Sequence, residues 1–96
     1  MPVVGSRASW RVAEVRTEGE KRLAVRFVDG TTGHVEMAEF LGSRHVDASI
    51  FAALRDDAIF RQAAVVAGSV RWPNGAELAP DAMYDAIRAS GHWHVT

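Results

Sequence analysis

Cysteine is absent from all 96 residues of the sequence. The chain therefore has no disulfide framework and no thiolate that could attack a substrate or bind a metal ion. Long apolar runs are absent too: no segment reaches the length of a membrane span, and the residues before Arg7 are too few for the apolar part of a signal peptide. These absences exclude thiol chemistry, and they lead us to expect a cytoplasmic protein with no membrane partner.

Sequence motifs of the common catalytic sites are missing as well. No serine lies in a G-x-S-x-G context, and the chain contains neither a P-loop nor a G-x-G-x-x-G sequence. We therefore predict a protein that is not an enzyme, with no catalytic residues and no bound cofactor.

Two groups of side chains can be considered as metal ligands. The carboxylates are those of Asp56, Asp57, Glu77, Asp81 and Asp85, and the imidazoles are those of His92 and His94. The two histidines would share one face of a strand, as two metal ligands require. However, carboxylates at helix starts are explained by the helix dipole, and no third ligand accompanies the histidines. We expect solvated carboxylates, a flexible tail over residues 91–96, and no metal site.

The charges are balanced overall, with a net charge of −1, but they are unevenly distributed. Residues 1–26 hold six of the 11 Lys and Arg side chains but only three of the 12 Asp and Glu side chains. A basic and aromatic patch for single-stranded nucleic acid could form from Arg7, Trp10, Arg11, Arg22 and Arg26. The alternative is a set of ordinary solvated strand faces, because three glutamates dilute the positive charge. We favour this alternative and do not expect nucleic acid as a partner.

Alternating apolar and polar residues predict three strands in the first part of the chain. They span residues 9–16, 23–28 and 32–37, with a charged turn between the first two and an Asp29-Gly30 turn before the third. The short connections indicate an antiparallel three-stranded meander.

The rest of the chain predicts short helices and strands. We expect a helical turn over residues 38–43, an exposed polar stretch over 44–49, an apolar patch over 50–54, a short helix from Asp56 or Asp57 to about Gln62, strands over 64–67 and 69–72, and a helix over 80–89. Pro80 suits the first position of this last helix, and Gly91 suits its end. The expected fold class is α+β: a small antiparallel sheet (the N-terminal three-stranded meander plus short strands) with one short helix and a C-terminal helix, in a single domain over residues 1–96 with its core in about 9–90.

The sequence W-P-N-G at residues 72–75 has a strong turn signature. Pro73 suits the second position of a type I or II turn, Asn74 the third, and Gly75 a following backbone conformation with positive φ. A two-residue Asn-Gly hairpin would instead pair Pro73, which has no N–H to donate. We predict a turn over residues 72–75 with a glycine bulge.

Several segments resemble a small bacterial family known as domain of unknown function 2442. They are F-A-A-L-R-D at residues 51–56, V-R-W-P-N-G-A-E-L at 70–78 and A-P-D-A-M-Y at 79–84, and V-R-F-V-D-G at 25–30 is similar to the family's N-terminal half. The resemblance covers about residues 10–88. It implies an α+β fold, and it carries over no catalytic residue.

Members of this family are often encoded beside another small protein, in arrangements that resemble toxin–antitoxin pairs. The resemblance therefore implies a non-catalytic protein-interaction module with a small protein partner encoded nearby. Some longer members add a C-terminal helix-turn-helix, for which we expect this chain to have no room.

The interaction residues that we expect are Trp72, Pro73, Asn74, Gly75 and Glu77. An exposed Trp72 beside a rigid turn would make a binding hot spot; the alternative is that Trp72 packs on the sheet and the turn is structural. A second function is weak nucleic-acid binding through the arginine-rich N-terminal strands. Homodimerisation through a sheet edge or through the apolar patch over residues 50–54 is a further option.

Overall fold

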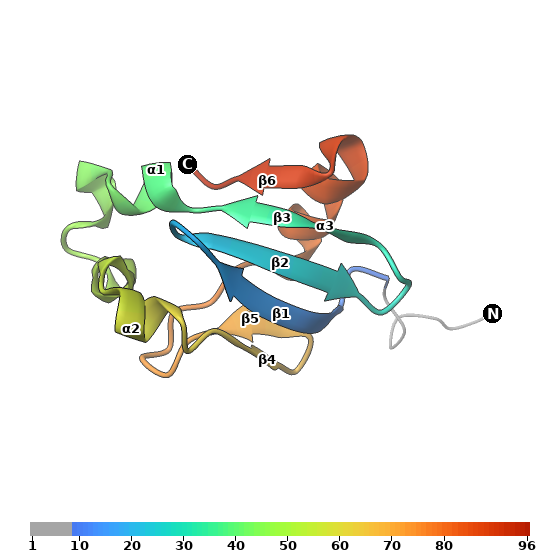
Figure 1. Cartoon of the computed structure of the whole chain (residues 1–96), viewed down its shortest axis with the longest axis horizontal. Coiled ribbons are helices and arrows are strands. Elements are labelled where there is room, and N and C mark those ends of the chain that lie inside the picture. Colours follow the sequence, from blue (N-terminus) through green and yellow to red (C-terminus); the bar gives the residue numbers. More distant parts are fainter. Residues whose placement is uncertain (1–8) are drawn as a thin grey trace.

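The computed structural model describes residues 9–96, in which four strands form the main sheet. The strands are β1 (Val12–Glu18), β2 (Arg22–Phe27), β3 (Thr32–Glu36) and β6 (His92–His94), in the order β1-β2-β3-β6. The first three are antiparallel neighbours in sequence order, as Figure 1 shows. The predicted meander is thus confirmed, and so is the α+β fold class.

Strand β1 contains a β-bulge, which explains its imperfect alternation. Val12 pairs with Phe27 but Glu14 pairs with Arg26, so that Ala13 is an extra residue. The bulge shifts the alternation by one residue and lets both Val12 and Val15 face the core side of the sheet.

Four short helical segments follow β3. They are α1 (Ala38–Leu41), the 3-10 turns η2 (Arg44–Val46) and η3 (Ile50–Arg55), and α2 (Asp57–Phe60). The Asp56 carboxylate accepts a hydrogen bond from the Ala58 N–H at 2.8 Å, so Asp56, one of the two predicted starts, caps α2. The stretch over residues 44–49 is not wholly exposed, because Val46 is buried in the core. Val46 is buried because the turn of η2 directs its apolar side chain inward.

A two-stranded hairpin of β4 (Ala64–Val66) and β5 (Ser69–Arg71) lies beside β1. Its two turn residues, Ala67 and Gly68, both have positive φ values, of 52° and 84°, as a tight two-residue turn requires. The Gly68 carbonyl accepts a hydrogen bond from the Val12 N–H at 2.8 Å, which fixes the hairpin to the start of β1.

Helix α3 (Pro80–Ser90) closes one face of the main sheet. Pro80 begins the helix and Gly91 ends it with a φ of 87°, both as predicted, and the N-cap residue Ala79 provides no side-chain hydrogen bond. Met83 and Ile87 are its buried residues. At 11 residues, α3 is the longest helix of the part described, and no helix there is long and apolar enough to cross a membrane.

The expectation of a flexible tail over residues 91–96 is wrong. Residues 92–94 form β6, which pairs in parallel with β3 and makes the sheet mixed rather than purely antiparallel. Two backbone hydrogen bonds flank the pairing, from the His34 N–H to the Gly91 carbonyl at 3.2 Å and from the Val95 N–H to the Glu36 carbonyl at 3.1 Å. Val95 is buried. The left-handed residue Gly91 turns the chain back so that these residues lie beside β3.

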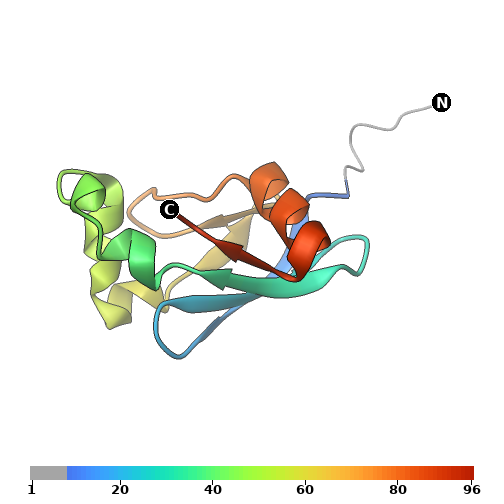
Figure 2. The same ribbon diagram turned by 90° about the horizontal axis from the view of Figure 1, so that it is seen from above.

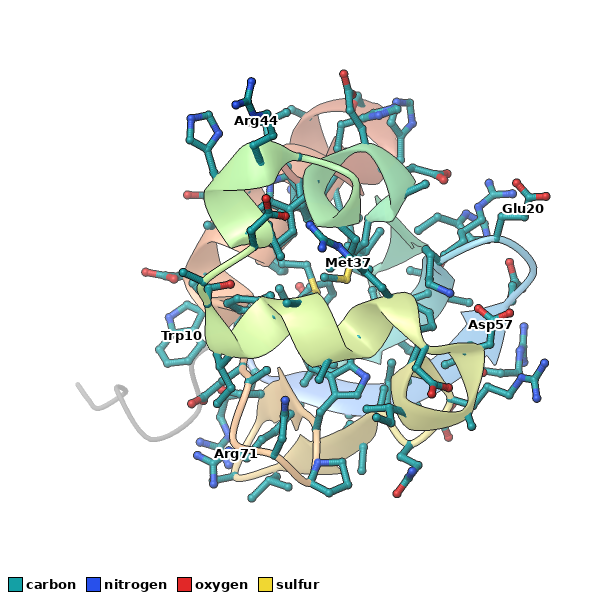
Figure 3. The ribbon with its side chains drawn as sticks, turned by 90° about the vertical axis from the view of Figure 1, so that its left-hand side faces the viewer. Trp10, Glu20, Met37, Arg44, Asp57 and Arg71 are labelled. Atoms are coloured by element: carbon teal, nitrogen blue, oxygen red, sulfur yellow. The ribbon has the colours of Figure 1, made fainter. Side chains whose placement is uncertain are left out.

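The core lies between the inner face of the main sheet, α3 and the segment that follows β5. Its largest fully buried side chains include Trp72, Phe27, Leu23 and Met37. Figure 2 shows α3 and the chain around β5 on the same side of the sheet. Figure 3 shows Met37 in the interior behind the helical segments, with Arg44, Glu20 and Asp57 at the periphery.

The outer face of the main sheet is polar. Its members, assigned from the strand register, are Glu14, Arg16, Glu18, Arg22, Ala24, Arg26, Thr32, His34, Glu36, His92 and His94. None of them is buried, whereas Leu23, Val25, Phe27 and Val35 on the inner face are. An open groove of about 940 Å³ crosses this outer face, bounded by the first residues of β4 and by Gly91.

Tyr84 ties α3 to the turn between β2 and β3. Its hydroxyl donates a hydrogen bond to the Asp29 carboxylate at 2.6 Å, and the Thr31 N–H donates a second at 2.9 Å. The Tyr84 hydroxyl, followed by Thr31, lowers the pKa of Asp29 from its ordinary value.

Replacing Tyr84 by Phe is expected to raise the pKa of Asp29 toward its ordinary value of about 3.9. Because the folded pKa of Asp29 is depressed, the stabilisation is present above the unfolded pKa and is lost as the pH falls through the folded pKa. The difference in free energy of unfolding between the wild type and Tyr84→Phe should therefore be larger at neutral pH than in acid. Urea unfolding of both proteins at neutral pH and at about pH 3 measures it, and an equal difference at both values would contradict this role of Tyr84.

Candidate functional site

Two backbone hydrogen bonds hold the turn that follows β5. The Gly75 N–H donates to the Trp72 carbonyl, and the Trp72 N–H donates to the Ala76 carbonyl, both at 2.9 Å. Gly75 has a φ of 95°. This is the pattern of a four-residue turn followed by a glycine bulge. The predicted turn over residues 72–75 is confirmed, and the two-residue hairpin is excluded.

Trp72 lies in the core and only 1% of its surface is exposed. Its indole N–H donates a hydrogen bond to the Phe60 carbonyl at 2.9 Å. The ring centroids of Trp72 and Phe60 lie 5.8 Å apart. The hypothesis of an exposed Trp72 is therefore wrong, and the alternative of a packed Trp72 is correct. The physical reason is that Trp72 is the first residue of the turn and its side chain points into the core.

Asn74 links the turn to η3. Its side-chain N–H donates to the Ile50 carbonyl at 2.9 Å, and its side-chain oxygen accepts from the Ala76 N–H at 3.0 Å. A Cβ atom on Gly75 would lie 3.4 Å from Cδ1 of Ile50, so the Ile50 side chain rests against this glycine. The turn and the start of η3 are thus joined by a hydrogen bond and by direct packing.

We call the surface formed by Ile50, Pro73, Asn74 and Gly75 the corner. All four residues are exposed, and Ile50 exposes 47% of its surface. Glu77 is also exposed. Its carboxylate pairs with the Arg71 guanidinium at 3.3 Å, and the two residues form an antiparallel bridge on either side of the turn. Four of the five expected interaction residues therefore lie at the surface on or next to the corner.

The arginines of the suggested nucleic-acid patch that the structure describes do not gather into one surface. Arg7 lies outside the described residues. Arg11 precedes the first pair of the β1–β2 ladder and its guanidinium lies against Gly68, whereas Arg22 belongs to the last pair of that ladder. Trp10 is 40% exposed.

Acidic partners also neutralise part of this patch. Arg22 pairs with Glu36 at 2.9 Å, and Arg26 pairs with Glu14 at 3.1 Å. The hydrogen bond from Arg26 lowers the pKa of the Glu14 carboxyl. Within residues 9–96, the arginines of this patch thus form no continuous basic strip for a nucleic-acid backbone.

The carboxylates weighed as metal ligands are dispersed. Asp56 caps α2, and Asp57 forms an ion pair with Lys21 that lowers the pKa of Asp57. This pair borders an open groove of about 670 Å³ between the β1–β2 turn and the helical segments. Glu77 pairs with Arg71, and Asp81 lies in the first turn of α3. No group of three acidic or histidine side chains in residues 9–96 is arranged as a metal site.

Ile50 is the residue of the corner that sequence reasoning missed. It was grouped with Phe51 and Leu54 as one apolar patch, but Leu54 is fully buried and Phe51 partly buried. The Ser49 hydroxyl accepts a hydrogen bond from the Phe51 N–H and caps η3. A serine at this position is a local signal for a helical start at Ile50. No local signal showed that Ile50 meets the turn at residues 72–75.

The chain is similar to one known protein family. No curated protein and no solved structure matches the chain significantly. The model of a family described as "Protein of unknown function (DUF2442)" matches residues 12–89, which span the structure from β1 into α3. The chain therefore belongs to the DUF2442 family.

Proposed function

We propose that this chain is a non-catalytic protein-interaction module that binds a small protein partner through the corner. The observation that carries the proposal is the exposed side chain of Ile50, held against Gly75 by a turn that is itself fixed by Asn74. A large apolar side chain on a rigid support is the usual form of a binding anchor.

The rigidity of the corner favours binding because little conformational entropy is lost when a partner docks. Asn74 uses both ends of its amide within the protein, and Trp72 fixes the base of the turn in the core. The Arg71–Glu77 pair supplies charged groups beside the apolar surface. An apolar centre with a polar rim is the common composition of a protein–protein interface.

The partner that we propose is the second protein of a small two-protein pair. This part of the proposal rests on the resemblance of the family's gene arrangements to toxin–antitoxin pairs. The alternative of nucleic-acid binding receives less support, because Arg22 and Arg26 are paired with glutamates and Arg11 lies at the opposite end of the β1–β2 ladder from Arg22.

Replacing Ile50 by Glu is expected to weaken partner binding about 30-fold, the loss of a hot spot worth about 2 kcal/mol. A charge at this position would be buried against the partner. The tagged chain is used to capture its partner from the native cell extract, and the affinity of the purified pair is then measured by calorimetry. The wild type should retain one small protein at near-equal stoichiometry.

Val28→Glu is the matched control for this experiment. Val28 is 50% exposed, similar to Ile50, and follows the last residue of β2, away from the corner. Both variants should keep the wild-type thermal unfolding midpoint, because neither side chain is buried. Equal binding by Ile50→Glu and the wild type, or equal losses in both variants, would refute the corner as the binding surface.

A further inference from the structure

The pairing of β6 with β3 brings three histidines together on the outer face. His34 is the register partner of His92, and His94 lies two residues further along β6, so all three side chains emerge on the same side. The rings of His92 and His94 have their centroids 5.1 Å apart. Neighbouring strands lie about 4.8 Å apart and alternate residues of one strand about 6.6 Å apart. The three Cα atoms therefore form a small triangle over which one ion can sit.

The neighbours of this triangle leave it room. The register partner of His34 on the other side is Ala24, whose side chain is a single methyl group. Both His92 and His94 are exposed on the edge strand, and the His34 side chain is 40% exposed. Each of the three side chains therefore borders solvent into which it can turn.

Two carboxylates lie beside the triangle. Glu36 is the register partner of His94, and Oε1 of Glu18 lies 3.5 Å from Nε2 of His34. The cations of the same two rows are already paired, Arg22 with Glu36 and Arg16 with Glu18. A carboxylate beside one ring nitrogen orients the imidazole and leaves its other nitrogen for a metal ion. Glu18 is placed to act on His34 in this way.

We propose that His34, His92 and His94 form a site for one divalent transition-metal ion, with Zn²⁺ as the typical occupant. Neutral imidazoles are preferred ligands of Zn²⁺, Ni²⁺ and Cu²⁺, whereas Mg²⁺ and Ca²⁺ prefer oxygen. Three imidazoles leave the fourth tetrahedral position of Zn²⁺ open to water or to a group from another molecule. Because no three such side chains in residues 9–96 are arranged as a metal site, binding requires rotation of the histidine side chains. The site shares no residue with the corner and is independent of the proposed function.

The test is a calorimetric titration of Zn²⁺ into the full-length, tag-free chain after treatment with a chelator. We expect one ion to bind per chain, and we expect each of His34→Gln, His92→Gln and His94→Gln to weaken binding by about tenfold or more. His45→Gln is the matched control, because His45 is the fourth histidine of the sequence and lies in η2, near Ser43. This control should bind as the wild type does. Circular dichroism of the metal-free variants checks that the fold is kept.

Three outcomes would overturn the proposal. The first is the absence of saturable binding by the folded wild type. The second is an equal loss of affinity in His45→Gln, which would indicate unspecific binding to surface histidines. The third is wild-type affinity in His34→Gln, which would reduce the site to the two histidines of β6.

Discussion

Replacing Trp72 by Ala is expected to lower the free energy of unfolding by about 3–5 kcal/mol, the range for removing a fully buried aromatic side chain. Trp72 is one of the largest fully buried residues, and it packs against Phe60. The substitution also leaves the Phe60 carbonyl without the indole N–H that it accepts at 2.9 Å. A loss of this size is a large part of the stability of a small domain.

Two further variants separate the loss of packing from the loss of the indole hydrogen bond. They also test the role of Trp72 if Trp72→Ala does not fold. Trp72→Phe keeps an aromatic ring but removes the N–H, and it should cost about 1–3 kcal/mol. Trp10→Ala is the control, because Trp10 is 40% exposed, and it should change stability by no more than about 0.5 kcal/mol. Urea unfolding followed by circular dichroism measures all three. Equal stabilities of Trp72→Phe and Trp10→Ala would contradict the buried position of Trp72.

Replacing Gly33 by Ala is expected to cost about 2–3 kcal/mol, at the upper end for overpacking a core. A Cβ atom at Gly33 would lie 2.5 Å from Cγ2 of Ile87 and 2.7 Å from the Gly91 carbonyl oxygen. Relief of the second contact requires movement of backbone. Because the same carbonyl accepts the His34 N–H, the substitution should also loosen the pairing of β6 with β3.

Gly19→Ala is the matched control for Gly33→Ala. A Cβ atom at Gly19 would have no neighbour within 4 Å, so this variant should match the wild type within about 0.5 kcal/mol. Urea unfolding gives the free energies, and hydrogen exchange of the Val95 amide reports on the strand pairing. Wild-type stability and wild-type exchange in Gly33→Ala would show that α3 and β6 do not lie against β3 as described.

The parts of the fold that could be predicted depend on local chemistry. Period-2 alternation and the Asp29-Gly30 turn were sufficient for the meander, and Pro80 and Gly91 were sufficient for the ends of α3. The turn over residues 72–75 was predicted in detail because proline, asparagine and glycine each restrict or extend the available backbone angles.

The parts that could not be predicted depend on contacts between distant residues. Residues 92–94 are too few to show a strand period, and their partner β3 lies far back in the sequence. Their pairing with β3 is also parallel, and parallel strands are not joined by a tight turn that could be recognised in the sequence. The histidine triangle follows from this pairing, so the sequence could show only that His92 and His94 would share a face if they formed a strand.

The corner was predicted in part. Pro73, Asn74 and Gly75 are exposed as expected, but the large apolar residue there is Ile50 rather than Trp72. Sequence alone does not fix which side of the hairpin faces the core, since a residue next to a turn can point either way. The link between Asn74 and Ile50 joins residues 24 positions apart, and no local pattern encodes it.

The most direct test of the corner is methyl NMR of the isoleucine-labelled chain with and without its partner. The sequence has three isoleucines, and only Ile50 belongs to the corner. Ile87 is a buried residue of α3 and Ile59 is a half-buried residue of α2, so both serve as internal references. We predict that the Ile50 methyl signal shifts most on binding and that the Ile87 signal stays in place. An unchanged Ile50 signal in the fully bound state would contradict the proposal that the partner docks on the corner.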